Sequence, residues 1–406
     1  MATPPPPSDQ SADNGPGAVL ELIVSGRAQT RSAIVAATGL ARSTVLQRLD
    51  ALLESRLVIE TDERLASGGR PARVLQLNTR AGVIAAVDVG EERTRIVITD
   101  LGFRVIADHV EQIALSDGPA AILDHLSDTI HNMLLRAGPG LPPVVGLGLG
   151  LPAPVDYGAG KVVGWSIMSG WDGYDIRPHL QQEFAAPILI DNDVNLLTLA
   201  EHRRHWPTER HLFYVKAGTG IGSGMIIDGA LNRGSQGAAG DIGHAHISGF
   251  GDPLCRCGNL GCLESLAGGW ALARDLRGQP GGIPAADARD VMQLIRAGDS
   301  RAVGRLRAAG RVLGEAVAYA TSLLNPSIIV IGGALASAGD HLIAGARELI
   351  YQRSLPLATR DLRIIPTKFR SRAGIAGAVY LVLDKVLDPA SIDRALSAGR
   401  TPFAAP

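Results

Sequence analysis

The 406-residue sequence is poor in cysteine and in aromatic residues, and it has no excess of either charge. Three cysteines are too few, and odd in number, for the disulfide framework of a secreted protein, so we expect a reducing compartment. Lys plus Arg number 39 and Asp plus Glu number 40, and the resulting net charge of −1 provides no general attraction to nucleic acid. A nucleic acid partner would therefore have to contact a local basic patch.

Long apolar runs are also missing. No run reaches the roughly 20 residues that a membrane-spanning helix requires. The start of the chain holds four consecutive prolines and small polar residues instead of a basic region followed by an apolar one. We therefore expect a cytoplasmic protein that makes no membrane contact, with a disordered tail over residues 1–16. The length predicts two or three domains.

Residues 17–80 have the pattern of a winged helix-turn-helix. Apolar residues recur at helical spacing from Ala18, and further helices are expected over Arg31–Thr38 and Arg42–Leu53, on either side of a turn at Gly39. A short glycine-containing turn between two helices is typical of DNA-binding modules, in which the second helix of the pair reads the major groove. The alternative is a three-helix module that docks onto another protein.

Charge and a hairpin favour the DNA interpretation. The segment from Arg27 to Arg48 holds four arginines and no acid. The segments Leu57–Glu60 and Arg73–Leu77 alternate like two strands, and the loop between them, Gly68-Gly69-Arg70-Pro71, suits a wing that enters a narrow, A·T-rich minor groove. The predicted DNA contacts are Arg42, Ser43, Thr44, Gln47 and Arg48 in the major groove and Arg70 in the minor groove.

The body of the chain alternates strands with helices, which predicts α/β layers. Strand, turn and strand patterns near residues 83–107 recur near residues 212–229, and this near-repeat predicts two similar lobes that face a cleft. In the second pattern, the turn over residues 218–224 contains Gly218, Thr219, Gly220 and Gly222, whose backbone N–H groups could hold a phosphate.

A second candidate site follows a buried strand. The sequence Asp191-Asn192-Asp193-Val194-Asn195 opens a helix at the carboxyl end of that strand, where α/β proteins place ligands. A carboxylate there could accept the proton of a sugar hydroxyl that attacks a phosphoryl group. Simple helix capping is the alternative.

All three cysteines lie within eight residues, at Cys255, Cys257 and Cys262. With a nearby histidine they predict a closed tetrahedral site for structural Zn²⁺. His244 is the predicted fourth ligand, and His246 stays open as the alternative. The metal would bring Asp241 and Glu264 together beside a polyhydroxyl ligand.

Several stretches together resemble the ROK family of repressors and sugar kinases, from Gly17 to the C-terminal region. They are Asp88-Val89-Gly90, Gly150–Asp156, Asp191–Asn195, Gly218–Gly222, Gly240–His244 with the cysteine cluster and Glu264, and Asn325–Gly333. The resemblance implies an α/β protein with a winged helix-turn-helix followed by a two-lobed actin-like ATPase fold. It also implies a sugar pocket formed by Asn192, Asp193, Asp241, His244 and Glu264, with Asp193 at the catalytic-base position of the kinases.

Departures from the kinase pattern favour a regulator. The first hairpin turn reads Gly90-Glu91-Glu92-Arg93-Thr94, where the kinases have Asp-x-Gly-Gly-Thr, and the two carboxylates would repel a triphosphate by about 1–4 kcal/mol. Thr94 is a candidate for the displaced phosphate-binding hydroxyl. Asp241 replaces the usual Glu, and one extra residue separates His244 from Cys255.

The expected protein is therefore a sugar- or sugar-phosphate-responsive transcriptional regulator, which binds an operator in double-stranded DNA as a homo-oligomer, a dimer or a tetramer. A hexose kinase with an appended DNA-binding domain and a ligand-free scaffold are the alternatives. The expected domains are the winged helix at 17–80, a first lobe at 81–195 completed by a helix near 372–388, a second lobe at 196–371 and a tail at 389–406.

Overall fold

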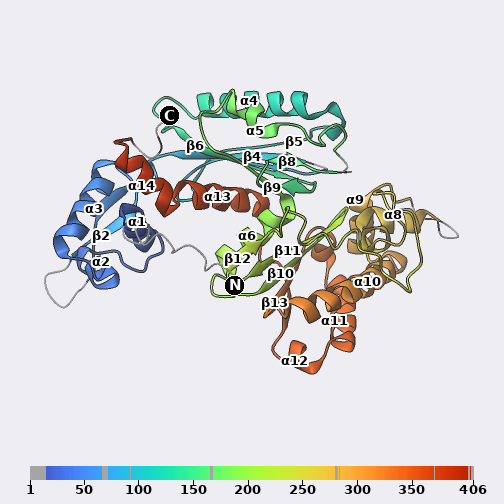
Figure 1. Cartoon of the computed structure of the whole chain (residues 1–406). Coiled ribbons are helices and arrows are strands. Elements are labelled where there is room, and N and C mark those ends of the chain that lie inside the picture. The colour runs from blue at the N-terminus through green and yellow to red at the C-terminus, as the bar shows by residue number, and fades with distance from the viewer. Residues whose placement is uncertain are drawn as a thin grey trace, which may run out of the picture.

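The computed structural model describes residues 15–65, 72–91, 93–164, 168–278, 282, 284–369, 371–400 and 403. Figure 1 shows three parts: a small N-terminal domain on the left, a lobe with a sheet at the top, and a second lobe at the lower right. The tail predicted before residue 17 falls largely outside the described residues, and the first helix begins at Pro16.

The N-terminal domain consists of three helices and a hairpin: α1 (Pro16–Val24), α2 (Arg31–Thr38), α3 (Arg42–Glu54), β1 (Val58–Leu65) and β2 (Ala72–Leu77). The Thr30 hydroxyl accepts a hydrogen bond from the Ala33 backbone N–H and caps α2, which ends at Gly39 with a φ of 66°. The strands β1 and β2 pair antiparallel, as in a wing. The loop between them, including Arg70, lies outside the described residues.

The first lobe is built on a five-stranded sheet in the order β5-β4-β3-β6-β9, with β3–β4 and β4–β5 antiparallel and β3–β6 and β6–β9 parallel. Helices α4 and α5 lie above it in Figure 1. Its elements are β3 (Val83–Val89), β4 (Thr94–Asp100), β5 (Val105–Glu111), α4 (Pro119–Arg136), β6 (Val144–Leu151), β7 (Val155–Asp156), β8 (Lys161–Val162), α5 (Ile176–Gln181) and β9 (Ile188–Asn192).

The second lobe repeats this topology. Its sheet has the order β12-β11-β10-β13-β14. As in the first lobe, the first two neighbouring pairs are antiparallel and the last two are parallel, so the internal repeat predicted from the sequence is confirmed. Its elements are β10 (Leu212–Ala217), β11 (Ile221–Ile227), β12 (Ala230–Asn232), α7 (Leu263–Ala267), α8 (Gly269–Gly278), α9 (Ala288–Arg296), α10 (Ser300–Leu324), β13 (Ile328–Gly332), α11 (His341–Arg353), α12 (Pro356–Thr359) and β14 (Arg363–Pro366).

Two helices join the lobes. The helix α6 (Asp193–His205) follows β9, and α13 (Ala373–Val386) packs against α6, β3 and β6. Gly377 makes this contact close: a Cβ there would lie 2.0 Å from the Leu196 carbonyl oxygen of α6. Only a residue without a side chain lets the two helix backbones approach this far.

The prediction of a tail after residue 388 is wrong for its first part. Residues Pro389–Ser397 form α14, which Asp388 caps and whose Ile392 is buried. Asp393 on α14 accepts a 2.7 Å hydrogen bond from the Gly17 backbone N–H of α1, so the C-terminal helix packs on the N-terminal domain. Figure 1 shows α14 between α13 and α1–α3.

One strand starts later than the sequence pattern indicates. The last strand of the pattern near residues 83–107 is β5, which begins only at Val105. The Asp100 side chain accepts hydrogen bonds from the backbone N–H groups of Gly102 and Arg104, and Phe103 has a φ of 67°, so these residues form a turn. In the described part of the chain, no helix combines the length and the apolar character needed to cross a membrane.

Candidate functional site

A cleft lies where the two lobes meet, at the carboxyl ends of the central strands. It is lined by the segment after β6, by β9 and the start of α6, by β10, the glycine turn and β11, by the segment before the cysteines, and by α7. The lining residues are Glu91, Pro152–Pro154, Asn192–Asn195, Lys216, Gly220–Ser223, Gly237–Asp241, His244 and Glu264. All five residues that the family resemblance implies for a sugar pocket are therefore at this cleft.

Most of the Asp191–Asn195 segment maintains the local structure, as the capping alternative predicted. The Asn192 side chain caps α6 through the Val194 N–H and donates to the Ala153 carbonyl oxygen, both at 2.9 Å. Asp191 is 1% exposed and accepts hydrogen bonds from Asn195 at 2.8 Å and from Arg233 at 2.7 Å. Only Asp193 is left to face the cleft with its carboxylate.

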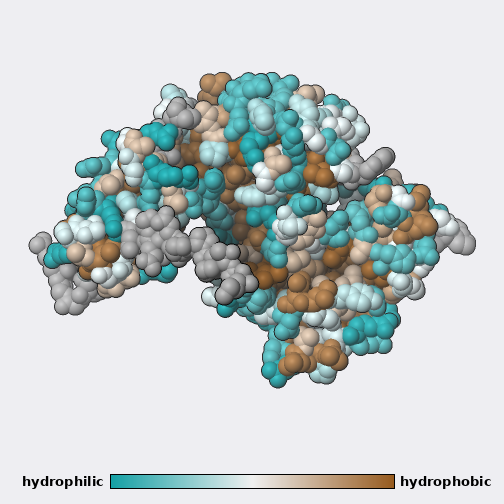
Figure 2. Space-filling view, viewed as in Figure 1, coloured by the Kyte–Doolittle hydropathy of each residue, from teal (hydrophilic) through white to brown (hydrophobic). Residues whose placement is uncertain are grey.

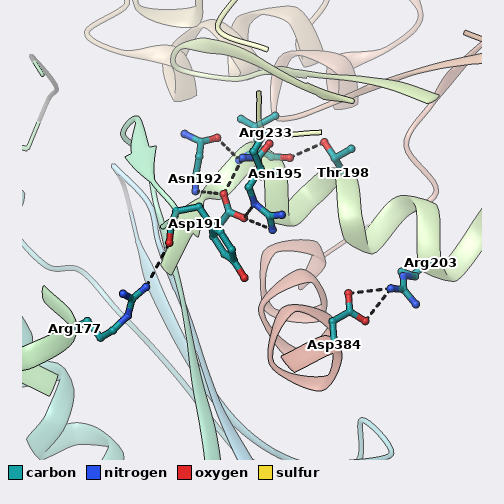
Figure 3. Close-up of polar contacts among 10 residues, drawn as sticks. Arg177, Asp191, Asn192, Asn195, Thr198, Arg203, Arg233 and Asp384 are labelled. Atoms are coloured by element: carbon teal, nitrogen blue, oxygen red, sulfur yellow. Dashed lines mark hydrogen bonds and ion pairs between the residues drawn. The ribbon is translucent and has the colours of Figure 1, made fainter. Parts of the chain in front are cut away.

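Figure 3 shows how this network ties the lobes together. Arg233 follows β12 of the second lobe, stacks on Tyr157 and binds Asp191 at the end of β9 in the first. On the other side of α6, Arg203 forms an ion pair with Asp384 of α13 at 2.8 Å. The sequence analysis missed both pairs, because their partners lie far apart along the chain.

Lys216 is the cleft residue that matters most and that the sequence analysis did not single out. Lys216 is the second-last residue of β10, just before the glycine turn. Its ammonium group forms an ion pair with Asp193, whose side chain is 9% exposed. Burial lowers the pKa of Lys216, but the carboxylates of Asp193, Asp88 and Glu91 outweigh it and raise the pKa overall. Asp193, which the family resemblance places at the catalytic-base position of the kinases, is thus paired with the ammonium group of Lys216.

The glycine turn is shorter and less open than predicted. Strand β11 already begins at Ile221, so Gly222 belongs to a strand, and the turn is Gly218-Thr219-Gly220. The Gly218 N–H donates to the Gly220 carbonyl oxygen at 2.9 Å, and the Ile221 N–H donates to Glu264 Oε2 at 3.0 Å. Of the four residues predicted to hold a phosphate, Gly218 therefore has its N–H already bonded, and so does Ile221, which was not among the four.

The three cysteines and His244 come together as predicted. One ligand atom from each of the four residues lies within 4.8 Å of all the others. His244 Nδ1 is 3.7 Å from Cys255 Sγ, and Cys257 Sγ is 3.7 Å from Cys262 Sγ. His246 instead contacts Asp252 at 2.9 Å. The donor set fits a four-coordinate metal ion bound by three thiolates and one imidazole.

Charged residues around the mouth of the cleft also pair across it. Glu91, from the first hairpin turn, lies 3.4 Å from Arg256 of the cysteine segment, and the Arg256 guanidinium stacks over Trp270 at 4.9 Å. Glu92 lies outside the described residues. Thr94 is fully buried and is not among the residues that line the cleft, so it does not offer the displaced phosphate-binding hydroxyl.

The predicted DNA-reading helix is α3. Arg42, Ser43 and Gln47 are exposed on it, whereas Thr44 and Arg48 are half-buried. The basic patch is weaker than the sequence indicates, because Arg27 pairs with Glu21 at 2.6 Å and Arg31 pairs with Glu60. Both acids lie outside the acid-free segment, on either side of it.

Comparison with known proteins identifies the lineage. The ROK family pattern matches residues 84–385. The chain belongs to the ROK family. A xylose repressor of Caldicellulosiruptor bescii is 28% identical over 381 residues, which cover 91% of this chain and 95% of that protein. A glucokinase of Halalkalibacterium halodurans is 26% identical over 73% of this chain and 93% of the relative.

A solved structure extends the match to the whole chain. The crystal structure of a ROK family transcriptional regulator, described as a homolog of the E. coli MLC protein, is similar with a TM-score of 0.82 and 25% identity. The match covers 98% of this chain and 100% of that chain. The fold is therefore the two-lobed actin-like ATPase fold preceded by a helix-turn-helix domain.

The pKa of Asp88 gives a test of the acidic cleft. Asp88 is the second-last residue of β3. Burial, with a further contribution from Asp193, raises the pKa of its carboxyl to about 6, although Lys216 opposes the rise. The folded state then binds the proton more tightly than the unfolded state, so the stability due to this group is lost as pH rises from about 4 to 6. Asp88→Asn should therefore become more stable relative to wild type across this range, by about 3 kcal/mol at most.

Chemical denaturation between pH 4.5 and 7.5 measures this difference. Asp117→Asn, at an exposed acid outside the cleft, serves as the control and should track wild type. A difference between Asp88→Asn and wild type that stays constant over this range would contradict the assignment.

Proposed function

We propose that this protein is a sugar-responsive DNA-binding transcriptional regulator, a repressor of carbohydrate genes. One observation carries the proposal: the cleft retains polar groups suited to a sugar, while a protein lysine is paired with the carboxylate that a kinase would need as its base. The alignment with a xylose repressor over 91% of the chain supports the same conclusion.

The effector would lie between the lobes. The carboxylates of Asp193, Asp241 and Glu264 are acceptors for sugar hydroxyls, and His244 and Asn192 complete the proposed pocket. Glu264 is already oriented by two donors, the Ile221 N–H at 3.0 Å and Trp270 Nε1 at 3.1 Å. Fixed acceptors of this kind favour a polyhydroxyl ligand with few rotatable bonds to order.

The path from the cleft to DNA would run through packed helices. The apolar cluster of the N-terminal domain continues without a break into α14, α13, α6 and the underside of the first sheet. Closure of the lobes around an effector would move α6 and α13, and α14 would pass that motion to α1. Two winged helices in a homo-oligomer would then change their spacing on a pseudo-palindromic operator.

Self-association has a candidate surface. Four large apolar side chains are 63–84% exposed there. They are Tyr319 and Leu323 on α10, Leu355 just before α12, and Leu357 in α12. Figure 2 shows apolar surface at the lower end of the molecule, where Figure 1 places α12. An exposed apolar surface of this kind supports a dimer or a tetramer of this chain.

The metal in the cysteine cluster is proposed to be structural Zn²⁺. Bound zinc supplies a rigid cross-link and leaves no open coordination position for catalysis when four protein ligands hold it. Its ligands His244 and Cys262 flank the cleft, and Glu264 lies two residues after Cys262. The cluster would thus hold two pocket residues in place.

A hexose kinase with an appended DNA-binding domain is the second candidate. It is favoured by Asp193 in the cleft and by the similarity to a glucokinase. Two features oppose it: Lys216 engages the Asp193 carboxylate that would act as the base, and the Glu91 carboxylate at the first hairpin turn would repel a triphosphate.

The DNA-reading role of α3 can be tested with Gln47→Ala. DNA selected by the wild-type protein from a randomised duplex pool should bind this variant about 5- to 150-fold more weakly, because one base-edge contact is worth about 1–3 kcal/mol. Sequence preference should relax at one position. Gln182→Ala, an exposed glutamine in the first lobe, is the matched control. Equal affinity of Gln47→Ala and wild type in a fluorescence anisotropy titration would exclude α3 as the reading helix.

Zinc content tests the metal site. Elemental analysis of the purified protein should find about one zinc per chain, and Cys257→Ser should retain little, because a site with one ligand fewer loses its closed tetrahedral shell. His246→Ala should keep the metal, since His246 contacts Asp252 and lies outside the cluster. Loss of zinc from His246→Ala with retention in Cys257→Ser would show that the ligands are wrongly assigned.

A further inference from the structure

Several groups that a phosphate could use in the cleft are already bonded to the protein itself. The Lys216 ammonium pairs with Asp193, and the Ile221 N–H donates to Glu264. Ser223 donates both its backbone N–H, at 3.1 Å, and its hydroxyl, at 2.6 Å, to the Gly240 carbonyl oxygen. A phosphate ester entering the cleft would have to break these bonds before it gained any of its own.

The protein also supplies its own anions at the turn where a phosphoryl group would bind. A Cβ on Gly220 would lie 2.4 Å from Glu264 Oε2, so the Glu264 carboxylate lies directly against the turn. Among the residues that line the cleft, Glu91, Asp193, Asp241 and Glu264 carry carboxylates, and Lys216 is the one lysine or arginine. A ligand that brings two further negative charges meets a net negative surface with its single cation already paired.

We infer that the effector is an uncharged sugar, that its phosphate ester is excluded, and that Lys216 sets this selectivity through its pairing with Asp193. The inference rests on the proposed function, because it concerns the ligand of the same cleft. Lys216 holds the Asp193 carboxylate in place as an acceptor for a neutral hydroxyl, and Asp193 keeps the Lys216 ammonium from a phosphate. While the two groups are paired, neither is available to bind a phosphorylated ligand.

Matched ligand pairs give the first test. Isothermal titration calorimetry of the wild-type protein should be carried out with D-glucose and glucose 6-phosphate, D-xylose and xylose 5-phosphate, and N-acetylglucosamine and its 6-phosphate. In every pair with a binding member, the free sugar should bind at least tenfold more tightly than its ester.

Two variants separate the role of Lys216 from that of the overall charge. Asp193→Asn leaves Lys216 without its partner, so it should weaken binding of the free sugar by tenfold or more and strengthen binding of the ester by at least tenfold. The double variant Asp193→Asn with Lys216→Met keeps the same formal charge balance as wild type at this pair and removes the freed cation. It should lose the gain for the ester, and thermal unfolding of both variants verifies that they are folded.

The outcomes distinguish the inference from the proposed function. If wild type binds a phosphate ester as tightly as the free sugar, the inference is wrong, while a sugar sensor remains. If Asp193→Asn gains no affinity for the ester, or the double variant gains as much, Lys216 does not set the selectivity. Absence of binding for both members of every pair would overturn the proposed function and the inference together.

Discussion

The ion pair between Lys216 and Asp193 is the interaction on which the function of this cleft depends. It joins the last part of β10 in the second lobe to the first residue of α6, at the point where the two lobes meet. A carboxylate that accepts a proton from a substrate hydroxyl must be free to approach it, and here the half-buried Lys216 ammonium group engages Asp193 Oδ2. Around this pair, the Asp191–Arg233 bond and the Glu91–Arg256 contact link the same two lobes, so three separate ion pairs hold the cleft together.

Helix α6, which begins in the cleft, also forms part of the connection to the N-terminal domain. Helix α6 begins with Asp193, packs closely on α13 at Gly377, and is tied to it by the Arg203–Asp384 pair. Helix α14 then packs on α1. When one of two closely packed helices moves, its neighbour has to move with it, because close-packed protein interiors change between discrete arrangements and do not deform continuously. Occupancy of the cleft can therefore affect the position of the DNA-binding helices.

Local patterns in the sequence predicted the elements and the metal cluster well. The start of α6 follows from its polar cap Asn192, and the cysteine cluster stands out because the chain has no other cysteines. The preference for His244 over His246 agrees with the geometry, since only His244 reaches the cysteines.

Interactions between distant residues could not be predicted in this way. Lys216 and Asp193 are 23 residues apart, and Arg233 and Asp191 are 42 apart, so only the folded arrangement of the lobes reveals these pairs. The arginines of the N-terminal domain illustrate the same limit, because Glu60 lies 29 residues from Arg31, which it neutralises. The helix α14 is a different case, because its start has a local signal: Asp388 is a cap and Pro389 is a first-turn proline. The prediction of a tail there relied on the composition of the C-terminal region and overlooked this signal.

The most direct test of the central claim is a coupled assay for sugar phosphorylation. The wild-type protein would be incubated with Mg²⁺, ATP and a panel of hexoses, pentoses and amino sugars, and both ADP and the sugar phosphate would be measured. With Lys216 paired to Asp193, neither product should form above the rate without protein, while sugar binding stays unaffected by ATP. Steady turnover of any sugar that Asp193→Asn abolishes would contradict this account.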